Sequence, residues 1–192
     1  MVCLPFGVVE LVDHPSEGAR AIVVVSLQMT HPDDLRPSPQ PPGARAELIT
    51  EGASLMSRDL YARVGGPWSW VDRAGWSDEQ WRAWTDREAH RLWVLRVRED
   101  IAGYAELEQG EAGAVEIAYF GLLPGWAGRG LGGWLLTHAL SEAWSLPGSQ
   151  RVWVHTCELD SPAALANYRA RGMREFARSV EWRMPRPDTV AP

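Results

Sequence analysis

The sequence predicts an α/β (α+β) domain: a central, mixed, mostly antiparallel twisted sheet of about six to seven strands, flanked by about four helices. Short runs rich in β-branched and aromatic residues alternate with longer runs whose apolar residues recur at helical spacing. Three of the strand-like runs follow one another through short turns, as in an antiparallel meander. At 192 residues the chain is long enough for one such core.

The first 43 residues are interpreted as an N-terminal extension. Residues 7–12 have the composition of a short strand, and residues 21–29 that of a strand at the edge of a sheet. Residues 32–43 contain five prolines, so they form an extended connector that cannot be helical. The chain is thus divided into the extension (1–43), a main domain (44–184) and a C-terminal tail (185–192).

The first part of the main domain is predicted to contain one strand and two helices. Residues 44–49 form the strand, and residues 54–64 form a helix because apolar residues recur there at helical spacing. A Gly-Gly-Pro run ends that helix. Ser77, with Gln80 three residues later, is a capping box that begins the second helix, which extends to about residue 88.

The second part alternates strands with helices. The last strand of the meander leads through a glycine-rich turn into a central helix. A later helix begins at a cap formed by Asp160 or Ser161 and ends at Gly172. The other expected elements are strands over residues 92–98, 101–108 and 115–122, the central helix over 129–144, and strands over 151–157 and 175–184.

Composition and charge narrow the classes of function. The chain is 45% hydrophobic and 23% charged, as in ordinary globular proteins, and its formal net charge of −6 argues against a nucleic-acid partner. It contains no apolar run long enough to cross a membrane, and no basic stretch precedes an apolar one at the N-terminus. Two cysteines, Cys3 and Cys157, do not make a disulfide framework, so we expect a cytoplasmic protein.

The turn before the central helix carries the clearest chemical signal. Glycines let the backbone approach phosphate oxygens closely, and the first N–H groups of a helix have no partner within it. A pyrophosphate at this helix N-terminus therefore receives several hydrogen bonds, and an arginine in the turn adds a charged contact. The residues expected to bind it are Gly128, Arg129, Gly130, Leu131, Gly132 and Gly133.

Two familiar nucleotide motifs do not fit this turn. A dinucleotide fingerprint needs G-x-G-x-x-G, whereas this turn has G-x-G-x-G-G. A nucleoside-triphosphate loop needs a lysine followed by Ser or Thr after its last glycine, where this chain has Trp134. A simple tight turn and an unrelated nucleotide-binding α/β domain remain as alternatives.

The turn resembles the acyl-CoA loop of the GNAT N-acetyltransferase superfamily, whose pattern is Q/R-x-x-G-x-G/A. Gly130 and Gly132 occupy the two small positions of that pattern, whereas Ala127 stands at the Gln/Arg position. This departure affects one side-chain contact and leaves the backbone cradle unchanged.

A second resemblance follows one strand later, in residues 160–176 (DSPAALANYRARGMREF). They are similar to the GNAT element N-x-x-A-x-x-L-Y-x-x-x-G-F, with matches at Ala164, Tyr168 and Gly172 and with Ser161 in place of the asparagine. The two motifs occur in the order of the family, and the resemblance covers most of the main domain.

The resemblance implies a fold and a reaction. The fourth and fifth strands of the domain, over residues 115–122 and 151–157, are expected to separate into a V-shaped opening that holds the pantetheine arm of acetyl-CoA. The implied reaction is direct transfer of the acetyl group to a primary amine of a small molecule or peptide. No metal is expected, because the sequence has no Cys/His cluster with ligand spacing. The acceptor stays open, and so does the oligomeric state, a homodimer included.

Glu116, on the strand that leads into the turn, is the candidate general base. A protonated amine cannot attack until it loses a proton, and many members of the family carry a glutamate on this strand. Glu106 and Glu108 on the preceding strand compete for this role. His155 has a suitable ordinary pKa but is more simply interpreted as a packed strand histidine.

Two further roles follow from the resemblance. Tyr168 matches the tyrosine that protonates the departing CoA thiolate, and its alternative is an amphipathic residue at the rim of a packed helix. Backbone N–H groups near Leu122 and Leu123 are expected to hold the thioester carbonyl. Cys157 is interpreted as packing, because direct transfer needs no cysteine nucleophile.

The acceptor is expected between the first two helices. There Trp68 and Trp70, with Trp76, flank Asp72 and suggest a box for a cationic or aromatic amine. Glu106 is counted with this site, and a satellite hydrophobic core is the alternative for the tryptophans. The alternative function is a non-catalytic acyl-CoA-binding or regulatory protein on the same fold, which the departures from the family patterns permit.

Overall fold

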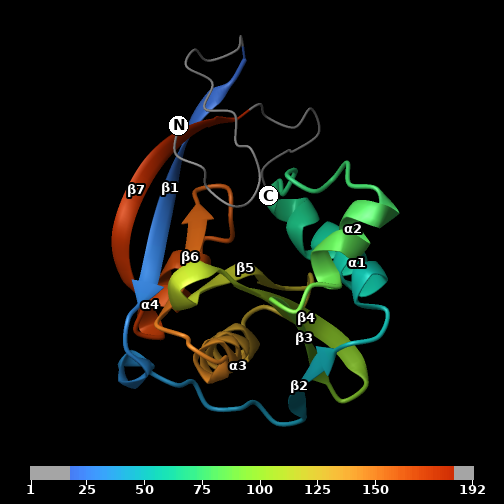
Figure 1. The fold of residues 1–192 in the computed structure, drawn as a ribbon, viewed down its shortest axis with the longest axis vertical. Helices are drawn as coiled ribbons and strands as arrows, with labels where there is room; N and C mark the ends of the chain where they lie inside the picture. The colour runs from blue at the N-terminus through green and yellow to red at the C-terminus, as the bar shows by residue number, and fades with distance from the viewer. Residues whose placement is uncertain (1–17, 184–192) are drawn as a thin grey trace.

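The computed structural model describes residues 18–183 as one seven-stranded sheet flanked by four α-helices (Figure 1). The predicted fold class is therefore confirmed. The strand predicted over residues 7–12 and the tail over residues 185–192 lie outside the described residues. The division of the chain after residue 43 stays a prediction.

The strands follow the predicted order along the chain and lie in the sheet in the order β2-β3-β4-β5-β6-β1-β7. Neighbouring strands are antiparallel, except that β5 and β6 are parallel. Their bounds are β1 Arg20–Met29, β2 Ala44–Ile49, β3 His90–Val97, β4 Asp100–Gln109, β5 Ala114–Leu122, β6 Arg151–Cys157 and β7 Arg174–Arg183.

The four α-helices are α1 Ala53–Gly65, α2 Asp78–Thr85, α3 Leu131–Ser145 and α4 Ala164–Ala170, with short 3₁₀ turns η1 Pro32–Asp34, η2 Gly66–Trp68 and η3 Glu111–Gly113. The capping box at Ser77 and Gln80 is confirmed. Helix α2 ends at Thr85, before the predicted residue 88. The Arg87 Nε donates to the carbonyl of Trp84 at 3.0 Å and caps the last turn, and the chain then enters β3.

The prediction of an edge strand over residues 21–29 is wrong. Strand β1 lies between β6 and β7 and pairs with both, so β7 forms the edge instead. Its side chains explain this position, because Ile22, Leu27 and Met29 are buried. Burying such residues stabilises an inner strand that packs on neighbours at both sides.

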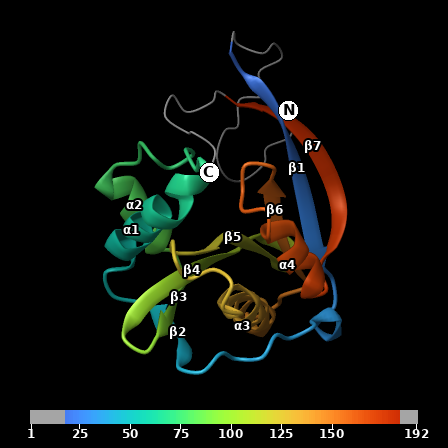
Figure 2. The same ribbon diagram turned by 180° about the vertical axis from the view of Figure 1, so that it is seen from behind.

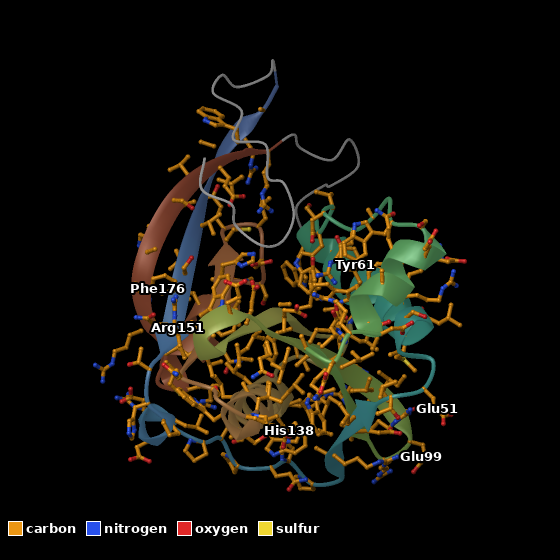
Figure 3. The ribbon with its side chains drawn as sticks, viewed as in Figure 1. Glu51, Tyr61, Glu99, His138, Arg151 and Phe176 are labelled. Carbon is orange, nitrogen blue, oxygen red and sulfur yellow. The ribbon has the colours of Figure 1, made fainter. Side chains whose placement is uncertain are left out.

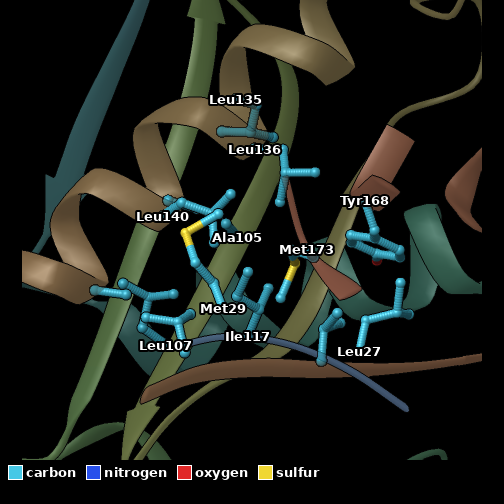
Figure 4. Close-up of a cluster of buried hydrophobic side chains, with 14 of the residues drawn as sticks. Leu27, Met29, Ala105, Leu107, Ile117, Leu135, Leu136, Leu140, Tyr168 and Met173 are labelled. Carbon is cyan, nitrogen blue, oxygen red and sulfur yellow. The ribbon is translucent and has the colours of Figure 1, made fainter. Parts of the chain in front are cut away.

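Helices cover the sheet on opposite faces, α3 on one and α1 with α2 on the other, as the two opposite views show (Figures 1 and 2). The larger core fills the space between α3 and the sheet, with Leu135, Leu136 and Leu140 on the helix and Leu107 and Ile117 on the strands (Figure 4). A smaller core lies under α1 and includes Leu60, Val64, Leu92, Val94 and Tyr104.

The two parallel strands stay together only at their beginnings. The β5–β6 pairing covers three positions and ends at Glu116 opposite Trp153, although both strands continue well beyond that point. A bulge lies just past it, because the β4–β5 register shifts and leaves Ala118 unmatched. A bulge bends the strand that carries it, so β5 and β6 separate into the expected V-shaped opening.

Candidate functional site

The glycine-rich turn lies at the start of α3, as predicted. Gly128 and Gly130 have φ angles of 78° and 75°, in the left-handed region that side chains disfavour, and Gly130 is the N-cap of α3. Trp134 is the first residue of the helix to donate back, to the Gly130 carbonyl at 3.3 Å. The N–H groups of Leu131, Gly132 and Gly133 precede that bond, so they are oriented to receive an anion.

Side chains add positive charge around this turn. Arg129 is exposed within the turn and its guanidinium lies 4.9 Å from the ring centre of Trp126. Arg171, at the end of α4, was not singled out by the sequence. A Cβ built on Gly133 would lie 2.7 Å from its Nη1, which places the guanidinium against the first turn of α3.

Helix α4 is tied to the same turn. The Asn167 side chain donates to the carbonyl of Gly132 at 3.1 Å. The N–H of Arg36 donates to the carbonyl of Arg171 at 3.0 Å, so residues before β2 also brace this end of the molecule. These contacts join residues far apart in the sequence, and no local sequence pattern predicts them.

Backbone groups of β5 face the opening. Leu123 donates its N–H to the carbonyl of Ala102 at 2.9 Å, so it has no free N–H for a carbonyl, which corrects the expectation for this residue. In an antiparallel ladder, bonded and non-bonded pairs alternate. Leu122 opposite Gly103, and Phe120 two residues earlier, therefore turn their N–H groups away from β4 toward the gap. Phe120 is a position that the sequence did not indicate.

Tyr168 lies beside this opening on α4, but deeper than a rim residue. It is 5% exposed and its ring packs against Phe120, with the ring centres 6.0 Å apart, near Leu27 and Met173 (Figure 4). Burial and the nearby carboxylate of Asp160 raise the pKa of Tyr168 above its ordinary value, so the phenol keeps its proton.

Glu116 and His155 meet where β5 and β6 separate. The Nδ1 of His155 lies 3.3 Å from Oε1 of Glu116. The Glu116 side chain is 14% exposed, whereas that of His155 is 48% exposed. Hydrogen bonding to Glu116 raises the pKa of His155 against the opposing effect of burial. The sequence assigned His155 to packing, but the structure places it in contact with the candidate base.

Glu106 does not belong to an acceptor site, which is a second correction. It is 0% exposed and accepts hydrogen bonds from Ser57 and from Trp84 Nε1 at 2.7 Å. His90 Nε2 lies 3.2 Å away, and Arg73 donates at 3.5 Å. Burial alone would raise the pKa of Glu106, but these hydrogen bonds and charges lower it below its ordinary value. A carboxylate enclosed in this way holds structure together and has no surface for a substrate.

Glu108 also has a charged partner, Arg87. Arg87 donates to its two oxygens at 2.6 and 2.8 Å, in the bidentate geometry that arginine prefers. Burial raises the pKa of Glu108 and Arg87 opposes that effect. Of the three glutamates weighed as a base, Glu106 and Glu108 therefore have arginine partners.

An aromatic box does form beside α2, but Trp76, Trp84 of α2 and Tyr119 of β5 make it, and the chain fills it with its own cation. The guanidinium of Arg73 is buried and lies 3.6 Å from the ring centre of Trp84, 4.3 Å from that of Tyr119 and 4.5 Å from that of Trp76. Of the three tryptophans predicted to form a box for an external amine, Trp76 thus packs on the chain's own Arg73, which supports the satellite-core alternative for Trp76. Trp68, in η2, is half-buried.

Asp72 remains on the surface beside the filled box. Its side chain is 61% exposed and accepts hydrogen bonds from the hydroxyls of Tyr119 and of Tyr61, the latter at 2.9 Å. Tyr61 comes from α1 (Figure 3). Its Oδ2 also lies 4.0 Å from Nε of Arg73, so the carboxylate is fixed in position while most of it stays accessible.

Trp70 reaches across the opening to the segment after β6. Its Nε1 donates to Oδ1 of Asp160 at 3.0 Å, while Thr156 and the Cys157 N–H donate to Oδ2 at 2.7 and 3.0 Å. This use of Asp160 explains why it does not cap α4. The helix begins at Ala164, later than expected, after a turn in which Ser161 accepts from the N–H of Ala164 at 2.8 Å.

Neither a metal cluster nor a membrane-spanning helix occurs within residues 18–183. No cluster of three or more His, Cys, Asp or Glu side chains there has an arrangement that would hold a metal ion. None of the helices in that range is long and apolar enough to cross a membrane.

Comparison with known families gives one match. Residues 45–173 match the model of the acetyltransferase (GNAT) family. This range contains the glycine-rich turn, Glu116, His155 and Tyr168. No curated protein matches the chain.

Solved structures share the fold at low identity. A GCN5-related N-acetyltransferase from Sphaerobacter thermophilus aligns with a TM-score of 0.67 and 20% identity, over 86% of this chain and 52% of its own. One from Kribbella flavida gives 0.64 and 18%, over 86% and 59%. An aminoglycoside acetyltransferase from an uncultured soil metagenomic sample gives 0.56 and 16%, over 67% and 87%. The chain spans between half and three fifths of the first two proteins.

Proposed function

Because the chain belongs to the GNAT acetyltransferase family, we propose that it transfers an acetyl group from acetyl-CoA to a primary amine of a small molecule or peptide. The observation that supports this most is the separation of β5 and β6 directly beside a glycine-rich helix N-terminus. The free backbone edge of β5 can thus pair with an extended ligand arm, and the N-terminus of α3 can bind an anionic group at the end of that arm.

The residues present fit acyl-CoA. The pyrophosphate is proposed to bind the N–H groups of residues 131–133, with Arg129 and Arg171 as charged contacts. The pantetheine arm is proposed to lie along the free edge of β5 and to pair with it as an added strand would. The N–H groups of Phe120 and Leu122 then face the amide and thioester carbonyls.

The acceptor is proposed to be a cation. Asp72 is exposed and held by two tyrosines, while Glu116 on β5 and Asp160 after β6 also lie around the opening. Carboxylates of this kind favour a protonated amine over a neutral or anionic molecule. The aminoglycoside acetyltransferase with the same fold carries an amine-rich substrate in its name, which agrees with this class of acceptor.

The proposed reaction is direct. The amine loses a proton toward Glu116, either directly or through a group that hydrogen-bonds to this carboxylate, and its nitrogen attacks the thioester carbon. The C–S bond breaks as the C–N bond forms, and the electron pair goes to sulfur. Tyr168 is proposed to supply a proton to that sulfur, because its raised pKa keeps the phenol protonated at neutral pH.

A panel of amines with acetyl-CoA tests the proposal. We expect free thiol to appear only in the presence of an acceptor amine, and calorimetry to show binding of acetyl-CoA. Binding without thiol release across polyamines, aminoglycosides and peptide N-termini would favour the non-catalytic alternative. Protection from unfolding by ATP or NAD but not by CoA would favour an unrelated nucleotide-binding domain.

A further inference from the structure

The carboxylates on the α1–α2 face of the sheet differ in their partners. Glu106, Glu108 and Glu116 lie on this face, and Glu108 stands directly opposite Glu116 in the β4–β5 ladder. Glu106 and Glu108 have arginine partners, which stay charged at every physiological pH. Glu116 contacts a histidine, whose charge changes near neutral pH.

The position of this histidine follows from the strand geometry. Trp153 is the last residue of β6 that pairs with β5, opposite Glu116, and His155 lies two residues further along β6. Residues two apart in a strand share a face, so the ring stands on the side of Glu116, in the part of β6 that has left β5. Its side chain is about half exposed, whereas Glu116 is mostly covered.

From this geometry we propose that His155 is the group that takes the proton from the acceptor amine, and that Glu116 is the positioning residue behind it. The inference rests on the proposed acetyl transfer. A carboxylate can only accept, so we assign the ring hydrogen to Nδ1, which lies against Glu116. The other ring nitrogen, Nε2, is left with its lone pair as the base.

The proton balance of the step is complete. One proton of R–NH₃⁺ moves to Nε2 of His155, and the freed lone pair forms the C–N bond while the C–S bond breaks. Sulfur takes a proton from Tyr168, and the second proton lost by nitrogen replaces it on the phenol. One proton per turnover remains on the imidazolium, which lies near Glu116, and it passes from the half-exposed ring to solvent.

The surroundings of His155 favour its protonated form. Hydrogen bonding to Glu116 on β5 raises its pKa most, burial opposes this, and the charges of Glu116, of Asp160 after β6 and of Glu181 on β7 raise it further. Its partner on β1 in the ladder is the uncharged Ser26. The base must be neutral to accept a proton, so activity should rise with pH through a pKa above the ordinary value of about 6.5.

The test combines two variants with one matched control. In His155→Gln we expect kcat/KM for the amine to fall at least about a hundredfold at neutral pH and the rise of activity with pH to disappear. In Glu116→Gln we expect that rise to move to lower pH, because the carboxylate no longer stabilises the imidazolium. His31→Gln is the control, since His31 is exposed and also contacts a carboxylate, 3.5 Å from Asp33, in η1.

Two further measurements separate the possible failures. Calorimetry should give the same acetyl-CoA affinity in all variants, and an NMR titration should show a raised pKa of His155 that drops in Glu116→Gln. If His155→Gln keeps the pH profile and turns over within about threefold of His31→Gln, the assignment of His155 is overturned while the proposed function stands. A wild-type protein that binds acetyl-CoA but acetylates no amine would overturn both.

Discussion

At the scale of single residues, Tyr168 is the proposed acid, and its burial allows the role of its hydroxyl to be separated from that of its ring. The ring is packed against Phe120, so Tyr168→Phe keeps the packing and removes the hydroxyl alone. We expect this variant to fold normally and to lose about a hundredfold or more in kcat when chemistry limits the rate. The loss should shrink with an acyl donor whose thiol is more acidic, because that thiolate needs less protonation. Unchanged turnover with acetyl-CoA would leave Tyr168 as packing.

The shifted pKa of Glu106 predicts how the free energy of unfolding changes with pH. Its pKa is lowered in the folded protein, so its charged form contributes stability above the ordinary pKa of about 4.3, and that contribution is lost as the pH falls through the folded value. Glu106→Gln should cost about 3 kcal/mol at pH 7, because the buried guanidinium of Arg73 loses its charged partner. The difference from wild type should narrow in acid.

Urea unfolding at pH 7 and at pH 3 measures this difference. Glu99→Gln provides the comparison, since Glu99 is exposed and pairs with Arg45 on the surface, where an ion pair contributes about 0–1 kcal/mol. Equal stability of the Glu106 and Glu99 variants at pH 7 would contradict a structural role for the buried carboxylate.

At the scale of an element, the turn before α3 allows a matched pair of substitutions. Gly130 and Gly148 have φ angles of 75° and 74°, and valine at either position meets the same backbone strain. Only Gly130 precedes the N–H groups proposed to bind pyrophosphate. We expect Gly130→Val to weaken acetyl-CoA binding at least about tenfold and Gly148→Val to leave it unchanged, although both lose stability.

Calorimetry of the folded variants with CoA and acetyl-CoA measures this effect. A folded Gly130→Val with wild-type affinity would remove the turn from the binding site. The glycines at the start of α3 would then serve the left-handed backbone of the turn and its close packing, as where Arg171 and Ser38 approach Gly133.

At the scale of the whole molecule, the contact between Trp70 and Asp160 joins the α1–α2 layer to the segment after β6. It crosses the opening at which the acceptor is proposed to bind. Trp70→Phe keeps an aromatic ring against Tyr61 and Tyr119 but removes the donor to a carboxylate. A hydrogen bond to a charged group contributes about 1.5–3 kcal/mol to holding Asp160 in place. Without it the groups around the acceptor are less well fixed, so the acceptor KM should rise several-fold, with little change in acetyl-CoA affinity.

Steady-state kinetics with both substrates varied checks this expectation. Trp76→Phe is the comparison, because Trp76 packs on Arg73 and not on Asp160. If the two variants raise the acceptor KM equally, the effect comes from general loosening of the aromatic cluster and not from the contact across the opening.

The sequence by itself determined what depends on neighbouring residues. The capping box of α2, the glycine turn, the helical spacing of α3 and the meander of β3, β4 and β5 all arise from residues within a few positions of one another. These features can be predicted from the sequence because secondary-structure propensity, turn chemistry and apolar periodicity depend on neighbouring residues. The family motifs around Gly130 and Tyr168 are also local patterns, and they supported the prediction of the fold class.

Only the tertiary structure decided which distant groups meet. The sequence placed β1 at an edge, but burial of its side chains puts it inside the sheet. Glu106 was counted as a substrate contact and Trp76 as part of a box for an external amine, whereas Arg73 packs on Trp76 and pairs with Glu106. His155 reaches Glu116, 39 positions away in the sequence, because β5 and β6 pair and then separate. Such contacts result from packing of whole elements, whose free energy is shared among residues that no local pattern connects.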